Sequence, residues 1–105
     1  MTGALVVTWG TETQVFGKSF TAGRIGTVTG RAVLPDLVLD DEYASPLHAR
    51  FVPTGQGWTV EDLGSTNGTH VGTGVEREQV WEPRLLRKGD RVKIGHTILT
   101  VVPAG

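Results

Sequence analysis

Short apolar runs recur along the chain, and most are bounded by glycine, proline or aspartate. Valine and threonine are abundant in these runs, which is typical of strands on a pleated, half-buried surface. The pattern predicts strands near Leu5–Trp9, Gln14–Phe20, Gly26–Thr29, Leu37–Leu39, Ala49–Pro53, Trp58–Asp62, His70–Val71, Val80–Leu86, Arg91–Ile94 and Thr97–Val102. Many short strands with frequent turn signals predict an all-β sandwich or barrel.

The turn signals support the same fold class. Gly55-Gln56-Gly57 and Gly95-His96 predict hairpin connections, and Asn67-Gly68 is the strongest two-residue turn signal in the chain. The secondary structure of residues Val75–Leu86 is ambiguous. The charged run Glu76-Arg77-Glu78-Gln79 favours a helix, but Pro83 and Gly89 would limit such a helix to about two turns. We expect Trp58 to lie in or beside the core.

Composition narrows the possible functions. A chain of 105 residues is the length of one domain, and we expect residues 1–105 to form a single unit. The absence of cysteine excludes disulfides, thiolate zinc sites and cysteine nucleophiles. A formal net charge of −1 argues against a nucleic-acid partner. No apolar run approaches the length that spans a bilayer, and no basic residue precedes Lys18, so we expect a cytoplasmic protein.

The candidate catalytic motifs in the sequence are incomplete. Gly17-Lys18-Ser19 resembles the end of a phosphate-binding P-loop, but position 12 is Glu12 where that motif needs glycine. Ser65, His48 and Asp62 could suggest a hydrolase, but the segment Gly64-Ser65-Thr66-Asn67-Gly68 is not the G-x-S-x-G nucleophile elbow, and no α/β framework surrounds it. The three histidines show no metal-ligand spacing. We therefore expect no enzyme, no metal site and no cofactor.

Five short segments occur in a specific order. They are Gly30-Arg31, Asp36-Leu37-Val38-Leu39-Asp40, Ser45-Pro46-Leu47-His48-Ala49, the run from Asp62 to Thr69, and Lys88-Gly89-Asp90 leading into Val92-Lys93-Ile94-Gly95. Together they resemble the forkhead-associated (FHA) domain, most closely the modules of actinobacterial proteins that work beside Ser/Thr kinases. The resemblance implies a β-sandwich of two twisted, mainly antiparallel sheets whose loops at one end bind phosphothreonine peptides.

The residue chemistry suits such a ligand. A phosphothreonine carries about −1.5 to −2 charges and three strong acceptor oxygens. Arg31, which lies 14 positions before Ser45, offers a planar fork of donors that suits phosphate. Ser45 and Thr66 offer hydroxyl donors, and Asn67 can both donate and accept. By the resemblance, Arg31, Ser45 and Thr66 hold the phosphate while Asn67 holds the peptide backbone.

Other residues of the pattern have structural interpretations. The resemblance makes His48 a residue that braces the loop carrying Ser45, and Gly30 and Gly68 meet backbone requirements. Arg24 also follows a glycine, but it lies 21 residues before Ser45, and we expect it at most to flank the site.

Two alternatives remain open. Pro46 and Leu47 stand where the family usually has polar or basic residues, and proline has no backbone N–H to offer a phosphate. The chain could therefore be an FHA-fold interaction domain that binds its partner independently of phosphorylation. A small hydrolase would be the other class, but no base–nucleophile pair supports it.

We expect a monomer whose partner is a phosphothreonine-containing protein, either a Ser/Thr kinase or a kinase substrate. A loop around Trp81 could carry a second contact surface.

Overall fold

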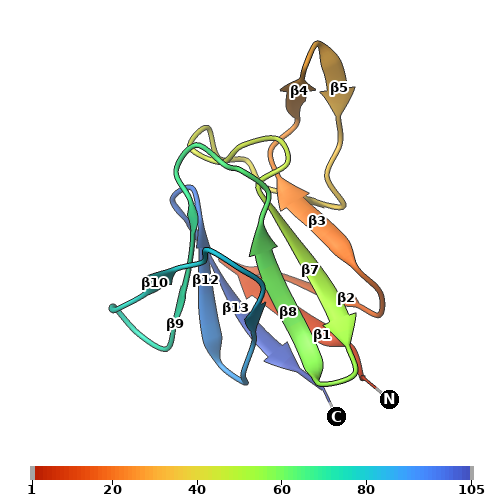
Figure 1. Ribbon diagram of the computed structural model, residues 1–105, viewed down its shortest axis with the longest axis vertical. Coiled ribbons are helices and arrows are strands. Elements are labelled where there is room, and N and C mark those ends of the chain that lie inside the picture. Colours follow the sequence, from red (N-terminus) through yellow and green to blue (C-terminus); the bar gives the residue numbers. More distant parts are fainter. Residues whose placement is uncertain (1, 105) are drawn as a thin grey trace.

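The computed structural model describes residues 2–104, and within them every regular element is a β-strand (Figure 1). A six-stranded sheet contains, in spatial order, β10 (Glu78–Gln79), β9 (Thr69–Gly72), β12 (Asp90–Ile94), β13 (Thr97–Pro103), β1 (Leu5–Trp9) and β2 (Glu12–Phe16). A five-stranded sheet contains β11 (Arg84–Leu85), β8 (Gly57–Asp62), β7 (Ala49–Thr54), β3 (Phe20–Gly23) and β6 (Leu37–Val38). Strands β4 (Gly26–Val28) and β5 (Arg31–Val33) form a separate hairpin.

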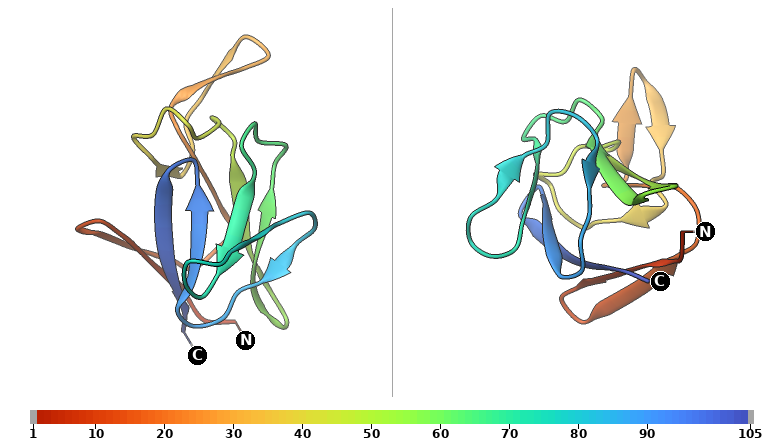
Figure 2. Two further views of the ribbon diagram at one scale, coloured as in Figure 1. Left: turned by 90° about the vertical axis from the view of Figure 1, so that its left-hand side faces the viewer. Right: turned by 60° about the horizontal axis from the view of Figure 1, so that its bottom comes forward.

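Strand pairing in both large sheets is antiparallel except between β3 and β6, which run parallel. The two sheets face one another and enclose the apolar core, so the prediction of a mainly antiparallel β-sandwich is confirmed (Figure 2). No helix among residues 2–104 is long and apolar enough to cross a membrane.

The core is built from side chains that alternate along the strands. In β1, Leu5 and Val7 are fully buried while their neighbours are less so, as the two-residue period of a strand requires. Phe20 stacks on Phe51 with ring centroids 4.7 Å apart. Trp58 is fully buried, and its indole N–H donates to the carbonyl of Gly3 at 2.8 Å, so its one polar group is satisfied. The tryptophan is thus a core residue.

Two predicted strands differ from the structure. The single strand predicted over Gln14–Phe20 is wrong, because β2 belongs to the six-stranded sheet and β3 to the five-stranded sheet. The chain crosses from one sheet to the other between them. The strand predicted over Val80–Leu86 is also wrong, because only Arg84–Leu85 (β11) forms a strand there, and β10 (Glu78–Gln79), which precedes that range, belongs to the other sheet. Each crossing ends one hydrogen-bond ladder and begins another, which hydrophobic patterning does not reveal.

The turn predictions have mixed outcomes. Ile94 pairs with Thr97, so Gly95-His96 is the predicted two-residue hairpin connection. The turn signal Asn67-Gly68 lies in the loop between β8 and β9, and because these strands belong to different sheets the loop is not a hairpin. The hairpin that the sequence signals missed is β4–β5. Its turn residues Thr29 and Gly30 have φ angles of 47° and 78°, and positive values at both central positions define a type I′ turn.

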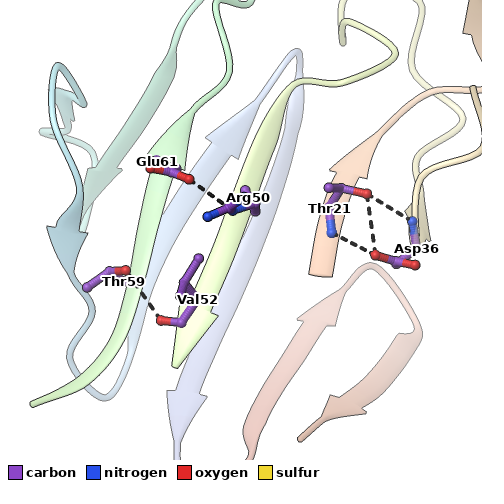
Figure 3. A network of polar contacts seen from close by, with 6 residues as sticks. All are labelled: Thr21, Asp36, Arg50, Val52, Thr59 and Glu61. Atoms are coloured by element: carbon purple, nitrogen blue, oxygen red, sulfur yellow. Dashed lines mark hydrogen bonds and ion pairs between the residues drawn. The ribbon is translucent and has the colours of Figure 1, made fainter. Parts of the chain in front are cut away.

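The β4–β5 hairpin leaves the five-stranded sheet after β3 and returns at β6 (Figure 1). Its return is fixed by Asp36, whose Oδ2 accepts a hydrogen bond from the Thr21 backbone N–H at 3.0 Å (Figure 3). The Asp36 N–H donates in turn to the Thr21 hydroxyl at 3.3 Å. On the same sheet, Arg50 pairs with Glu61 at 3.0 Å across β7 and β8. The hydrogen bonds between Thr21 and Asp36 therefore join the chain after the hairpin to β3.

Candidate functional site

Three connections meet at the end of the sandwich opposite the two termini (Figure 1). They are the β6–β7 loop over residues 39–48, the β8–β9 loop over residues 63–68, and the Gly95-His96 turn. The β4–β5 hairpin projects beyond them. Loops held at one end of a rigid scaffold are a common setting for binding sites.

His48 joins two of these loops. Its Nδ1 accepts a hydrogen bond from the Ser45 backbone N–H at 3.0 Å, and its Nε2 lies 2.8 Å from the Gly68 carbonyl oxygen. Because Nδ1 accepts, the ring proton is on Nε2, and that N–H donates to Gly68. Burial of the ring lowers the pKa of His48, although the Gly68 carbonyl and Asp62 oppose the effect. A neutral, fully buried imidazole therefore spans the loops.

Asp62 organises the β8–β9 loop from its start. Its Oδ2 accepts hydrogen bonds from the backbone N–H groups of Gly64 and Ser65, both at 3.0 Å. Its Oδ1 accepts from the hydroxyls of Ser65 and Thr69. Partial burial alone would raise the pKa of Asp62, but the hydrogen bonds from Ser65 and Thr69 outweigh it and hold that pKa below its usual value. The ionised carboxylate thus shapes a tight turn that presents the next residues.

The structure brings Ser45, Thr66 and Asn67 together. The Thr66 backbone N–H donates to the Ser45 hydroxyl at 3.1 Å, and the Asn67 side-chain amide donates to the Tyr43 carbonyl at 2.8 Å. Ser45 is half-buried, whereas Thr66 and Asn67 are exposed. Three short polar side chains therefore face solvent where two loops are tied together, which is a surface suited to binding an anion and a peptide backbone.

The two candidate arginines lie in different parts of the structure. Arg24 lies against the Ser45 loop, where its Nε donates to the Ala44 carbonyl at 2.8 Å and its backbone N–H to the Ser45 carbonyl at 3.2 Å. Arg31 is exposed in β5, paired with Val28 beside the turn at the tip of the hairpin. The structure therefore joins Arg24, rather than Arg31, to the loop that carries Ser45.

A hairpin signal in the sequence could have separated the two arginines. Thr29-Gly30 lies between two short runs of small and β-branched residues, Thr27-Val28 and Ala32-Val33. That arrangement is compatible with a type I′ turn, and such a hairpin places residues 26–33 between Arg24 and the Ser45 loop. Gly30 accordingly belongs to the hairpin tip, whereas Gly68, with φ 79°, belongs to the loop that His48 holds.

Pro46 packs at the base of the hairpin. A Cβ added to Gly26 would lie 2.7 Å from the Pro46 Cγ, and one added to Gly23 would lie 2.3 Å from the Pro46 carbonyl oxygen. Both glycines are therefore needed for this close approach. Leu47 is half-buried beside it. Pro46 thus fixes the distance between the Ser45 loop and the hairpin.

Comparison with known proteins assigns the family. The sequence profile of the FHA domain matches residues 27–95. The chain is 42% identical over 93 residues to the FHA domain-containing protein FhaB of Mycolicibacterium smegmatis. That match covers 89% of this chain and 57% of FhaB, so the chain spans little more than half the length of that relative. The chain belongs to the FHA domain family.

Solved structures share the fold. Mycobacterium tuberculosis EmbR, in complex with a low-affinity phosphopeptide, superposes with a TM-score of 0.74 at 25% identity, covering 98% of this chain and 25% of that one. The FHA domain of the CT664 protein from Chlamydia trachomatis gives a TM-score of 0.79 at 21% identity, covering 98% of this chain and 100% of that one. Among residues 2–104, no group of three histidine, aspartate or glutamate side chains is placed to hold a metal ion.

Proposed function

We propose that this FHA domain is a non-catalytic module that binds phosphothreonine-containing segments of proteins. The observation that carries the proposal is the junction of Ser45 with Thr66, beside Arg24, in a member of this family. A doubly charged phosphate needs a fixed cation and short neutral donors, and this junction supplies both within two tied loops.

Arg24 is the cation that we propose for the phosphate. The hydrogen bond from its Nε to the Ala44 carbonyl orients the guanidinium beside Ser45. The sequence pattern predicts this role for Arg31, which remains the alternative. Arg31 pairs with Val28, which is two residues after Gly26 in β4. Because each strand residue adds about 3.3 Å, Arg31 lies farther along the hairpin from its base than Gly26 does. It would have to reach back toward the phosphate, so we assign it a flanking position.

The neutral donors have separate roles in this proposal. The hydroxyls of Ser45 and Thr66 donate to phosphate oxygens, while the Thr66 N–H keeps the Ser45 side chain in place. Asn67 contacts the backbone of an extended peptide, and its hydrogen bond to the Tyr43 carbonyl sets its orientation. His48 and Gly68 support the loops from below without touching the ligand.

The partner that we propose is a phosphorylated Ser/Thr kinase or a substrate of one, bound in the cytoplasm by a monomeric domain. The complex of EmbR with a phosphopeptide supports a phosphorylated partner. A binding mode that does not use phosphate is the competing function, because Pro46 offers no N–H at the edge of the site.

A direct binding experiment separates the two functions. A library of phosphothreonine peptides is screened first, and the best binder is compared with its unphosphorylated form by isothermal titration calorimetry. Phosphate-dependent binding supports the proposal. A partner protein that binds equally well after phosphatase treatment would replace it with the phosphate-independent function.

A further inference from the structure

A groove adjoins the phosphate site on the hairpin side. It is lined by Arg24, Ile25, Val38, Leu39, Asp40, Asp41 and Glu42, and its volume is about 390 Å³. That volume is at the lower end of the range for ligand pockets, which suits one long side chain rather than a large ligand. Arg24 lines both this groove and the proposed phosphate site, so a peptide bound at Ser45 passes close to it.

The walls of the groove are apolar. Ile25 is 65% exposed and Val38 is 39% exposed, while Leu39 beneath them is buried. Ile25 immediately precedes β4 and Val38 belongs to β6, so the two walls stand where the hairpin leaves and rejoins the sheet. Exposed aliphatic groups on facing walls favour the methylene stem of a long side chain.

The rim of the groove is acidic. Asp40 and Glu42 are exposed, and within the described chain neither forms an ion pair. Asp41 is occupied differently: its carboxylate accepts hydrogen bonds from the Tyr43 and His96 backbone N–H groups and from the Thr97 hydroxyl. Asp40 and Glu42 are therefore the two carboxylates available to a ligand.

We propose that this groove binds a lysine or arginine side chain that flanks the phosphothreonine in the partner. The inference rests on the proposed function, because the phosphate anchors the peptide beside it. The stem packs between Ile25 and Val38, and the cationic head lies between Asp40 and Glu42. Phosphate bound at Arg24 offsets the positive charge of that arginine, which strengthens the attraction of the acidic rim for a cation. A purely apolar side chain would make no ion pair with Asp40 or Glu42.

The test uses a phosphothreonine peptide with alanine at its flanking positions. One residue at a time, from three before to four after the phosphothreonine, is replaced by lysine or by norleucine, which has a comparable unbranched side chain without the ammonium group. Affinities are measured at low salt for the wild type, for the Asp40→Asn/Glu42→Gln double variant, and for Glu12→Gln. The last removes an exposed carboxylate from β2 in the other sheet and serves as the matched control.

We expect one position at which lysine binds about three- to tenfold more tightly than norleucine, as two exposed ion pairs would give. The gain should disappear in the double variant and persist in Glu12→Gln. Equal affinity of lysine and norleucine at every position, with phosphate dependence intact, would overturn the groove assignment and leave the proposed function standing. If no peptide shows phosphate-dependent binding, the proposed function fails and the groove assignment fails with it.

Discussion

The Ser45 hydroxyl accepts a hydrogen bond from the Thr66 backbone N–H at 3.1 Å, across 21 residues of sequence. This contact ties the β6–β7 loop to the β8–β9 loop at the surface, and His48 ties the same loops below it. Two bridges at different depths keep the donors of the site at fixed separations before any ligand binds. A preorganised site loses less ordering entropy on binding.

Replacement of His48 by alanine should weaken folding before it changes any contact in the site. The variant leaves the Ser45 N–H and the Gly68 carbonyl without their partner in a buried place, and it opens a cavity. We expect a loss of about 2–4 kcal/mol in the free energy of unfolding, measured by urea denaturation. A variant with unchanged stability and abolished binding would show that His48 contacts the ligand.

Stability should also fall on mild acidification. The pKa of His48 in the folded state is lowered from 6.5, so the unfolded chain binds a proton more readily. The contribution of neutral His48 is complete above pH 6.5 and is lost as the pH falls below that value toward the folded-state pKa. Urea midpoints at pH 7.5 and 5.5 measure the effect. His48→Gln should show a smaller change between the two conditions, and an equal change in both proteins would assign the effect to other groups.

The site should prefer phosphothreonine over phosphoserine only modestly if the methyl group acts by burial alone. One buried methyl group is worth about 0.8 kcal/mol, which corresponds to about fourfold in affinity. A much larger ratio would mean that the methyl also fixes the rotamer of the bound residue. Calorimetry with two peptides that differ only in this methyl gives the ratio, and equal affinities would contradict the preference.

Pro46→Asn should tighten binding by restoring an N–H and adding a polar side chain. One charge-assisted hydrogen bond is worth about 1.5–3 kcal/mol, whereas the stiffness lost with proline costs about 0.4–1 kcal/mol. Pro46→Arg should tighten it too, with a stronger dependence on salt because its charge is screened. Dissociation constants at two salt concentrations test both variants. If neither binds more tightly, the packing of Pro46 on Gly26 matters more than the missing donor.

Much of the fold was predictable because each sheet has one buried face. Alternating burial in β1 and β12 follows the sequence pattern, and the sandwich follows from many such strands. The crossings between sheets at β2–β3 and β10–β11 were not predictable from that pattern. Hydrophobic period identifies a strand but does not say which sheet it joins.

The site divides in a similar way. Ser45, Thr66 and Asn67 lie in short loops whose spacing is visible in the sequence, and the structure brings them together. The choice between the two arginines does not follow from sequence, because the β4–β5 hairpin lies between Arg24 and Ser45 and carries Arg31 beside its turn. The number of residues between two positions does not predict their distance in space when a hairpin is inserted between them.

The proposed role of the phosphate cation is tested by comparing Arg24→Ala with Arg31→Ala on one phosphothreonine peptide. Each variant removes one arginine, and neither residue belongs to the buried core, so both should remain folded. We expect Arg24→Ala to lose about 3 kcal/mol or more of binding free energy, which is more than a hundredfold in affinity. Arg31→Ala should change affinity by only a few-fold, as expected for a flanking charge. Full affinity in Arg24→Ala, with the loss appearing in Arg31→Ala instead, would contradict the assignment and return the role to the hairpin arginine.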